Sequence, residues 1–130
     1  MKDHFVWNRG DKFPLSKNFL STEFECKCGG CTRQFISKDL VDKLQALRIY
    51  FGMPVKINSA YRCPDHNATV GGSQLSQHLL GRAADIVIID VPVNLVARKA
   101  DAIFNGLGRY TKFTHVDVRP NGAARWTGGY

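Results

Sequence analysis

Three side chains that lie far apart in the sequence, His78, Asp85 and His115, are of the types that bind a catalytic metal ion. Two imidazoles and one carboxylate form a common ligand set for catalytic zinc, and they leave a fourth coordination position for water. Zinc in such a site lowers the pKa of water to about 7 and polarises carbonyl groups, so the predicted chemistry is hydrolysis. Spacing alone is weak evidence, because motif matches of this kind are often accidental.

The first two candidates belong to the segment SQHLLGRAAD, residues 76–85. Six residues separate His78 from Asp85, which is too far for one helical turn. We therefore expect a loop to bring them together as it enters a buried strand, predicted by the apolar run at residues 85–89.

The third candidate, His115, lies in a segment of alternating polarity at residues 113–119, which predicts a strand. Residues two apart on a strand point to the same face. Phe113 and Asp117 are therefore expected on the face that carries His115.

The remaining pattern predicts an α+β fold. Ser37 is a suitable N-cap for an apolar helical repeat that runs to about Phe51, and Gly52 follows it. The other expected elements are a strand at 54–59, a helical turn after Pro64 that ends near residues 70–72, and a helix opened by Pro92 and ended by Gly106 and Gly108. This order predicts a small, mostly antiparallel sheet with flanking helices, preceded by an irregular segment at residues 1–36.

A length of 130 residues predicts a single domain, residues 1–130. The formal net charge of +7 predicts affinity for an anionic partner. We expect no nucleic-acid binding, because the sequence has no recognisable helix-turn-helix or aromatic platform. We also expect a monomer made in a cytoplasm without a signal peptide and without membrane insertion, since no apolar run approaches about 20 residues.

Four cysteines form an unusual group, with three crowded at Cys26, Cys28 and Cys31 and the fourth at Cys63. Four thiolates could bind a structural zinc ion, although this spacing is not that of a common zinc knuckle. One disulfide, or a glycine-rich turn with free thiols, is an equally valid interpretation.

The pattern S-x-H-x-x-G-x-A-x-D at residues 76–85 resembles that of the zinc D-Ala-D-Ala carboxypeptidase family. This family includes many phage endolysins and is grouped with lysostaphin-type peptidases and hedgehog domains. The likeness extends over about residues 15–126, through the segments at 23–29, 58–62, 66–72 and 115–119. The resemblance implies a hedgehog/DD-peptidase-like fold.

By position, the resemblance implies that His78, Asp85 and His115 bind Zn²⁺. Arg62 matches the arginine of the family's Ser-x-Tyr-Arg segment, which implies a role in holding a substrate carboxylate or the developing oxyanion. Ser76 is expected to bind substrate or to support its loop.

One position departs from the family pattern. Many members place a Glu or Asp general base three residues before the last zinc-binding histidine, where this chain has Lys112. Asp117 is the nearest substitute on the same strand face, and it could accept a proton from the attacking water. Alternatively, Asp117 orients His115 or pairs with Arg119.

The resemblance thus implies a zinc metallopeptidase that hydrolyses peptide bonds in peptidoglycan stem peptides, as an endolysin-like endopeptidase or a D,D-carboxypeptidase. The alternative is a zinc-containing, catalytically weak module for binding or virion assembly. In either case the expected place of action is the cell wall after release from the cytoplasm, or the virion.

Overall fold

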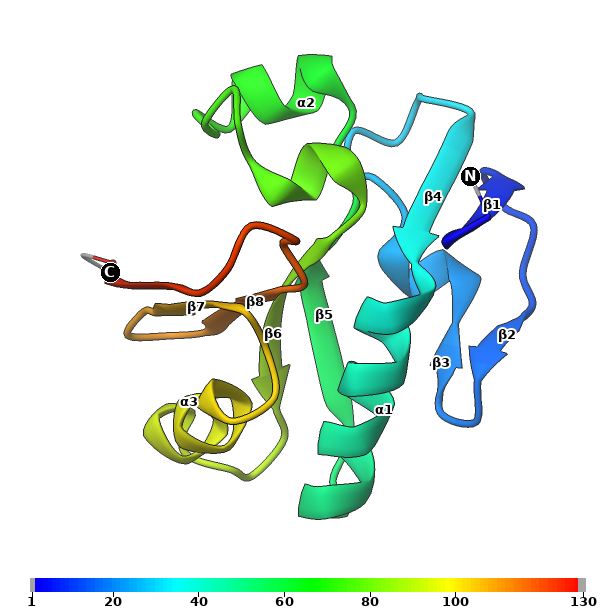
Figure 1. Ribbon diagram of the computed structural model, residues 1–130. Coiled ribbons are helices and arrows are strands. Elements are labelled where there is room, and N and C mark those ends of the chain that lie inside the picture. Colours follow the sequence, from blue (N-terminus) through cyan, green and yellow to red (C-terminus); the bar gives the residue numbers. More distant parts are fainter. Residues whose placement is uncertain (1, 129–130) are drawn as a thin grey trace.

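A five-stranded sheet forms the centre of the computed structural model, which describes residues 2–128 (Figure 1). The strands lie in the order β5-β6-β8-β7-β9. All neighbours are antiparallel except β7 and β9, which confirms the prediction of a mostly antiparallel sheet in an α+β fold. Their bounds are β5 Val55–Ser59, β6 Ala83–Ile88, β7 Gly106–Arg109, β8 Thr114–Asp117 and β9 Ala124–Thr127.

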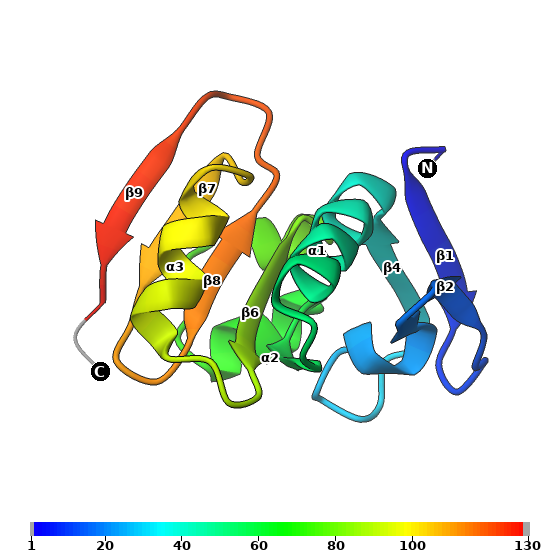
Figure 2. The ribbon, with the colours of Figure 1, turned by 90° about the horizontal axis from the view of Figure 1, so that it is seen from below.

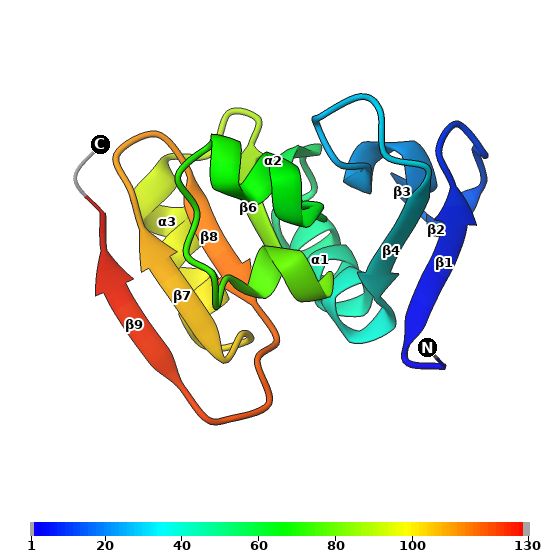
Figure 3. The ribbon, with the colours of Figure 1, turned by 90° about the horizontal axis from the view of Figure 1, so that it is seen from above.

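Helices cover the two faces of this sheet unequally. Helices α1 (Lys38–Phe51) and α3 (Val93–Asp101) lie on one face, and the short helix α2 (Pro64–Thr69) lies on the other (Figures 2 and 3). The 3₁₀ helix η2 (Gln77–Leu80) contacts α2 and β6. The face with α2 and η2 therefore has room for a cavity, while the face under α1 and α3 is closed by apolar packing.

The predicted ends of α1 are confirmed. The Ser37 hydroxyl accepts a hydrogen bond from the Leu40 N–H, and Gly52 ends the helix in the left-handed conformation at φ 66°. The helix buries an apolar stripe against the sheet, and each such side chain contributes roughly 1.5–3 kcal/mol. The stripe consists of Leu40, Val41, Leu44 and Leu47.

The prediction of an irregular segment at residues 1–36 is wrong in part. Strand β1 (His4–Asn8) pairs antiparallel with β4 (Arg33–Ser37) in a separate two-stranded sheet. Helix α1 lies between this sheet and the central one (Figures 2 and 3). The segment between β1 and β4 contains β2 (Pro14–Ser16), β3 (Phe19–Leu20) and the 3₁₀ helix η1 (Ser21–Phe24).

The C-terminal part also differs from prediction. Helix α3 ends at Asp101, and Gly106 and Gly108 lie within β7 instead of ending the helix. Strand β9 was not predicted, and β6 begins at Ala83, two residues before the expected start. Within residues 2–128, no helix has the length and apolar character needed to cross a membrane.

Candidate metal centre

Strand register brings two of the three candidate ligands side by side. Asp85 on β6 is directly opposite His115 on β8. Asp117 follows two residues later on the same strand, opposite Ala83 on one side and Gly106 on the other. Because residues two apart share a face, Asp117 lies next to the His115 ring, as the alternation predicts.

The third candidate, His78, reaches the same place from η2. Ser76 caps this short helix by accepting a hydrogen bond from the His78 N–H at 3.2 Å. The His78 Nδ1 donates to the Ala60 carbonyl at 2.7 Å. This contact turns Nε2 of the ring toward Asp85, whose Oδ1 is 3.3 Å away.

The His115 ring is oriented through Nε2, whereas the His78 ring is oriented through Nδ1. Its Nε2 donates to Oδ2 of Asp117 at 2.8 Å, and its Nδ1 faces Oδ1 of Asp85 at 3.0 Å. Asp117 is fully buried and receives further hydrogen bonds from the Arg119 side chain at 2.7 and 2.8 Å. The Asp117 carboxylate is therefore fixed beside His115.

These partners place unshared electron pairs at one point. A carbonyl oxygen and an ionised carboxylate only accept hydrogen bonds, so the proton of neutral His78 is assigned to Nδ1 and that of neutral His115 to Nε2. The other nitrogen of each ring then directs a lone pair toward the same Asp85 oxygen. Such an arrangement is repulsive unless a cation occupies the space between the three atoms.

Zinc fits this arrangement. One donor atom from each of the three residues lies within 4.8 Å of the others. Ligands about 2.0 Å from a tetrahedral zinc ion are roughly 3.3 Å apart, which is close to the two distances from the imidazoles to Asp85. An imidazole held by a carboxylate or a carbonyl through its other nitrogen is also the usual arrangement around bound zinc.

The pKa shifts of Asp85 and His115 also favour a positive charge between these side chains. Burial would raise the pKa of Asp85, but its contacts with the His115 and His78 rings outweigh burial and hold the pKa well below the ordinary value. Burial would lower the pKa of His115, yet its contacts with Asp117 and Asp85 raise it.

Arg62 contacts the outer oxygen of Asp85. Its guanidinium donates to Oδ2 of Asp85 at 3.4 Å, to the Ser59 hydroxyl at 3.2 Å and to the Asn67 amide oxygen at 3.3 Å. Arg62 thus fixes the Asp85 carboxylate through Oδ2, while Oδ1 faces the two histidines. Asn67, which is buried, was not identified from the sequence.

The three candidate ligands line an open cavity of about 460 Å³. Arg62 and Ser76 also line it, whereas Lys112 is exposed and lies outside its lining. Asp85 is the one carboxylate among the described residues that line the cavity.

The opposite wall comes from β8, β9 and the loops beside them, and most of it was not predicted from the sequence. The Trp126 ring lies 4.9 Å from the His115 ring, and the Arg119 guanidinium lies 5.3 Å above Trp126. Arg119, which is paired with Asp117, therefore also holds the Trp126 ring at the cavity wall through a cation–π contact. No signal in the sequence placed Trp126 there, because β9 itself was not predicted.

Comparison with known protein families agrees with this geometry. Residues 15–117 match the model of the family Peptidase M15, and no curated protein matches the chain. The match covers most of the sequence, so the chain belongs to the peptidase M15 family. The resemblance to zinc D-Ala-D-Ala carboxypeptidases is thereby confirmed, and it implies a zinc-dependent metallopeptidase of the peptidoglycan-related type.

Proposed function

We propose that this protein is a zinc peptidase that hydrolyses peptide bonds in the stem peptides of bacterial peptidoglycan and acts at the cell wall. One observation carries the proposal. Two imidazole lone pairs and one carboxylate oxygen converge at a cavity wall that solvent can reach. A catalytic zinc site differs from a structural one in this open position.

His78, Asp85 and His115 are the residues that would hold the zinc ion. Zinc in that position supplies a Lewis acid for the scissile carbonyl and makes hydroxide available near neutral pH. Arg62 fixes the Asp85 carboxylate and also lines the cavity, where its guanidinium can oppose negative charge on the substrate.

We assign Asp117 a positioning role. Its two oxygens are occupied by His115 and Arg119, and the side chain is completely buried. Of the two roles considered from the sequence, general base and orienting partner, these contacts favour the orienting partner. Asp117 keeps the His115 proton on Nε2, so that Nδ1 remains free to bind metal.

The charge around the cavity suits an anionic peptide. Arg62 and Arg119 both line it, paired with Asp85 and Asp117, and a zinc ion bound beside them would leave the site with a net positive charge. The C-terminal region, residues 91–130, contains six basic and two acidic residues. Stem peptides of peptidoglycan carry free carboxylates, so guanidinium groups at the cavity wall provide complementary charge.

Digestion of purified sacculi tests the proposal. We expect the zinc-loaded protein to release muropeptides with new peptide termini, identified by mass spectrometry, and the new termini also identify the cleaved bond. His78→Ala should abolish this release, whereas His66→Ala, which changes a histidine outside the metal group, should not. Unchanged muropeptides with zinc-loaded wild-type protein would contradict the peptidase proposal and favour a binding or assembly module.

A further inference from the structure

A second group of metal-binding side chains lies away from the cavity. The four cysteines come from three segments: Cys26 follows η1, Cys28 and Cys31 lie in the turn before β4, and Cys63 immediately precedes α2. Their sulfur atoms all lie within 4.8 Å of one another. No part of the proposed peptidase chemistry uses them.

The spacing of the sulfurs fits a tetrahedral ion. Sulfur ligands about 2.3 Å from zinc are roughly 3.8 Å apart. The sulfurs of Cys28 and Cys63, which come from segments 35 residues apart, are separated by 3.9 Å. A disulfide requires about 2.05 Å between two sulfurs and would leave the other two cysteines without a function. Gathering of all four sulfurs favours a shared ion.

Backbone N–H groups point at these sulfurs. The Gly30 and Cys31 N–H groups donate to Cys28 Sγ at 3.4 and 3.3 Å, and the Cys63 N–H donates to Cys26 Sγ at 3.3 Å. A neutral thiol is a weak acceptor, whereas a thiolate bound to a metal carries charge that such donors stabilise.

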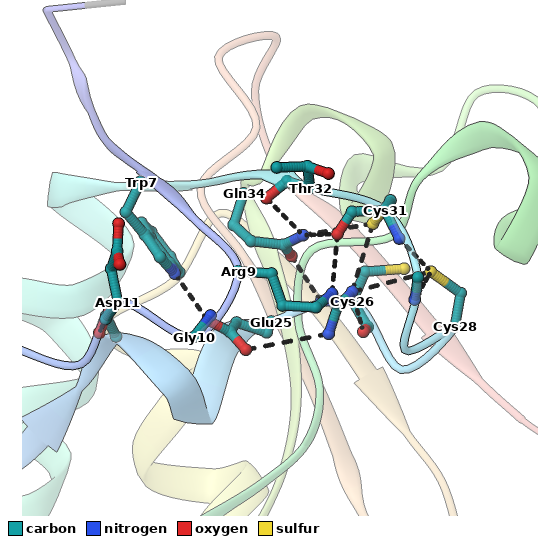
Figure 4. A network of polar contacts seen from close by, with 12 residues as sticks. Trp7, Arg9, Gly10, Asp11, Glu25, Cys26, Cys28, Cys31, Thr32 and Gln34 are labelled. Atoms are coloured by element: carbon teal, nitrogen blue, oxygen red, sulfur yellow. Dashed lines mark hydrogen bonds and ion pairs between the residues drawn. The ribbon is translucent and has the colours of Figure 1, made fainter.

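Two side chains add to this environment (Figure 4). Arg9 approaches Cys31 Sγ at 3.4 Å and Cys28 Sγ at 3.7 Å, and Gln34 donates to Cys31 Sγ at 3.2 Å. Arg9 is itself held by the carbonyls of Cys26 and Cys31, at 2.8 and 2.7 Å. Four thiolates and one divalent ion have a net charge of −2, and a fixed guanidinium beside them offsets part of it.

We propose that Cys26, Cys28, Cys31 and Cys63 bind a second zinc ion in a closed, structural site. All four ligands come from the protein, so no coordination position remains for a substrate. The ion joins the N-terminal segment to the loop at residues 60–63. That loop supplies the carbonyl of Ala60, which orients His78, and the guanidinium of Arg62. The site therefore stabilises the loop at residues 60–63, which supports the cavity, and it catalyses no reaction itself.

Metal analysis of the purified full-length protein tests this site without any activity measurement. After reconstitution with zinc and removal of loosely bound metal, we expect two zinc ions per wild-type chain and one in Cys28→Ser. Lys27→Ser changes the adjacent residue without removing a ligand, so it should retain two. One zinc per wild-type chain, or two in Cys28→Ser, would overturn the proposal.

Cobalt substitution keeps the test decisive if the cysteine variant fails to fold. Wild-type protein loaded with Co²⁺ should show the thiolate-to-cobalt charge-transfer absorption of a tetrahedral sulfur site. Thiol titration of the denatured, chelator-treated protein should find all four cysteines reduced. Absence of sulfur-bound cobalt, or loss of two thiols to a disulfide in freshly purified protein, would rule out the tetrathiolate site.

Discussion

His78 and His115 present different ring nitrogens to Asp85 because their other nitrogens have different partners. His78 uses Nδ1 to reach the Ala60 carbonyl, and His115 uses Nε2 to reach Asp117. Residue types in the sequence predicted which side chains converge. The tautomers could not be predicted, because they depend on a backbone carbonyl and a buried carboxylate whose positions only the fold defines.

The orienting role of Asp117 can be tested by removing its negative charge. In Asp117→Asn an amide can donate to Nε2 of His115, which moves the ring proton to Nδ1 and blocks metal binding there. We expect zinc affinity at the histidine site to fall about 10–100-fold, measured by competition with a chelating dye. Asp101→Asn removes an exposed carboxylate that pairs with Arg125, and it should leave the affinity unchanged. Equal affinities in the two variants would contradict the orienting role.

Arg62 provides a second prediction at this scale. Lysine keeps the positive charge but lacks the planar set of donors that reaches Ser59, Asn67 and Asp85 together. We expect Arg62→Lys to retain full zinc content and to lose at least about tenfold in the rate of sacculus hydrolysis, equivalent to about 1.4 kcal/mol. Arg33→Lys, at an exposed position on β4, is the matched control. An unchanged rate of hydrolysis in Arg62→Lys would contradict a role for the Arg62 guanidinium in the reaction.

At the scale of elements, local signals predicted α1 and β8 well. A capping serine, an apolar repeat and a terminal glycine define α1, and alternation defines β8. Strand β7 was missed because Gly106 and Gly108 are poor strand formers. The β1–β4 pair was missed because residues about 30 apart must pair, which no local pattern reports.

The glycine at 106 has a packing function that yields the third prediction. A Cβ at this position would clash with the Asp117 carboxylate on the neighbouring strand. We expect Gly106→Ala to lower the free energy of unfolding by about 1–3 kcal/mol, measured by urea denaturation. Gly30→Ala adds a methyl group where nothing lies within 4 Å, and it should have a much smaller effect. If Gly106→Ala lowered the free energy of unfolding as little as Gly30→Ala, the Asp117 carboxylate could move aside without cost, and the packing role of Gly106 would be contradicted.

At the scale of the whole molecule, we expect bound metal to contribute to stability as well as to chemistry. An ion that binds only the folded state stabilises it by about 2.7 kcal/mol at a free concentration 100 times its Kd. We expect chelation to lower the thermal midpoint of unfolding by several degrees and zinc, but not magnesium, to restore it. In Cys28→Ser the shift should be smaller, because the structural ion is already absent. A midpoint insensitive to chelation would contradict both metal sites.

The sequence predicts one side of the candidate site better than the other. The segment 76–85, which includes Ser76, was identified together with Arg62 and His115, because these residues match separate segments of a known family pattern. Trp126 was not, because it belongs to the edge strand β9, whose parallel pairing with β7 depends on the complete sheet.

The most direct test of the central claim is anomalous scattering at the zinc absorption edge from crystals of the zinc-loaded protein. We expect a peak bounded by Nε2 of His78, Oδ1 of Asp85 and Nδ1 of His115, with the remaining coordination position of the ion open to the cavity. A zinc-loaded crystal with no peak at these three atoms, or with a fourth protein ligand closing the site, would contradict it.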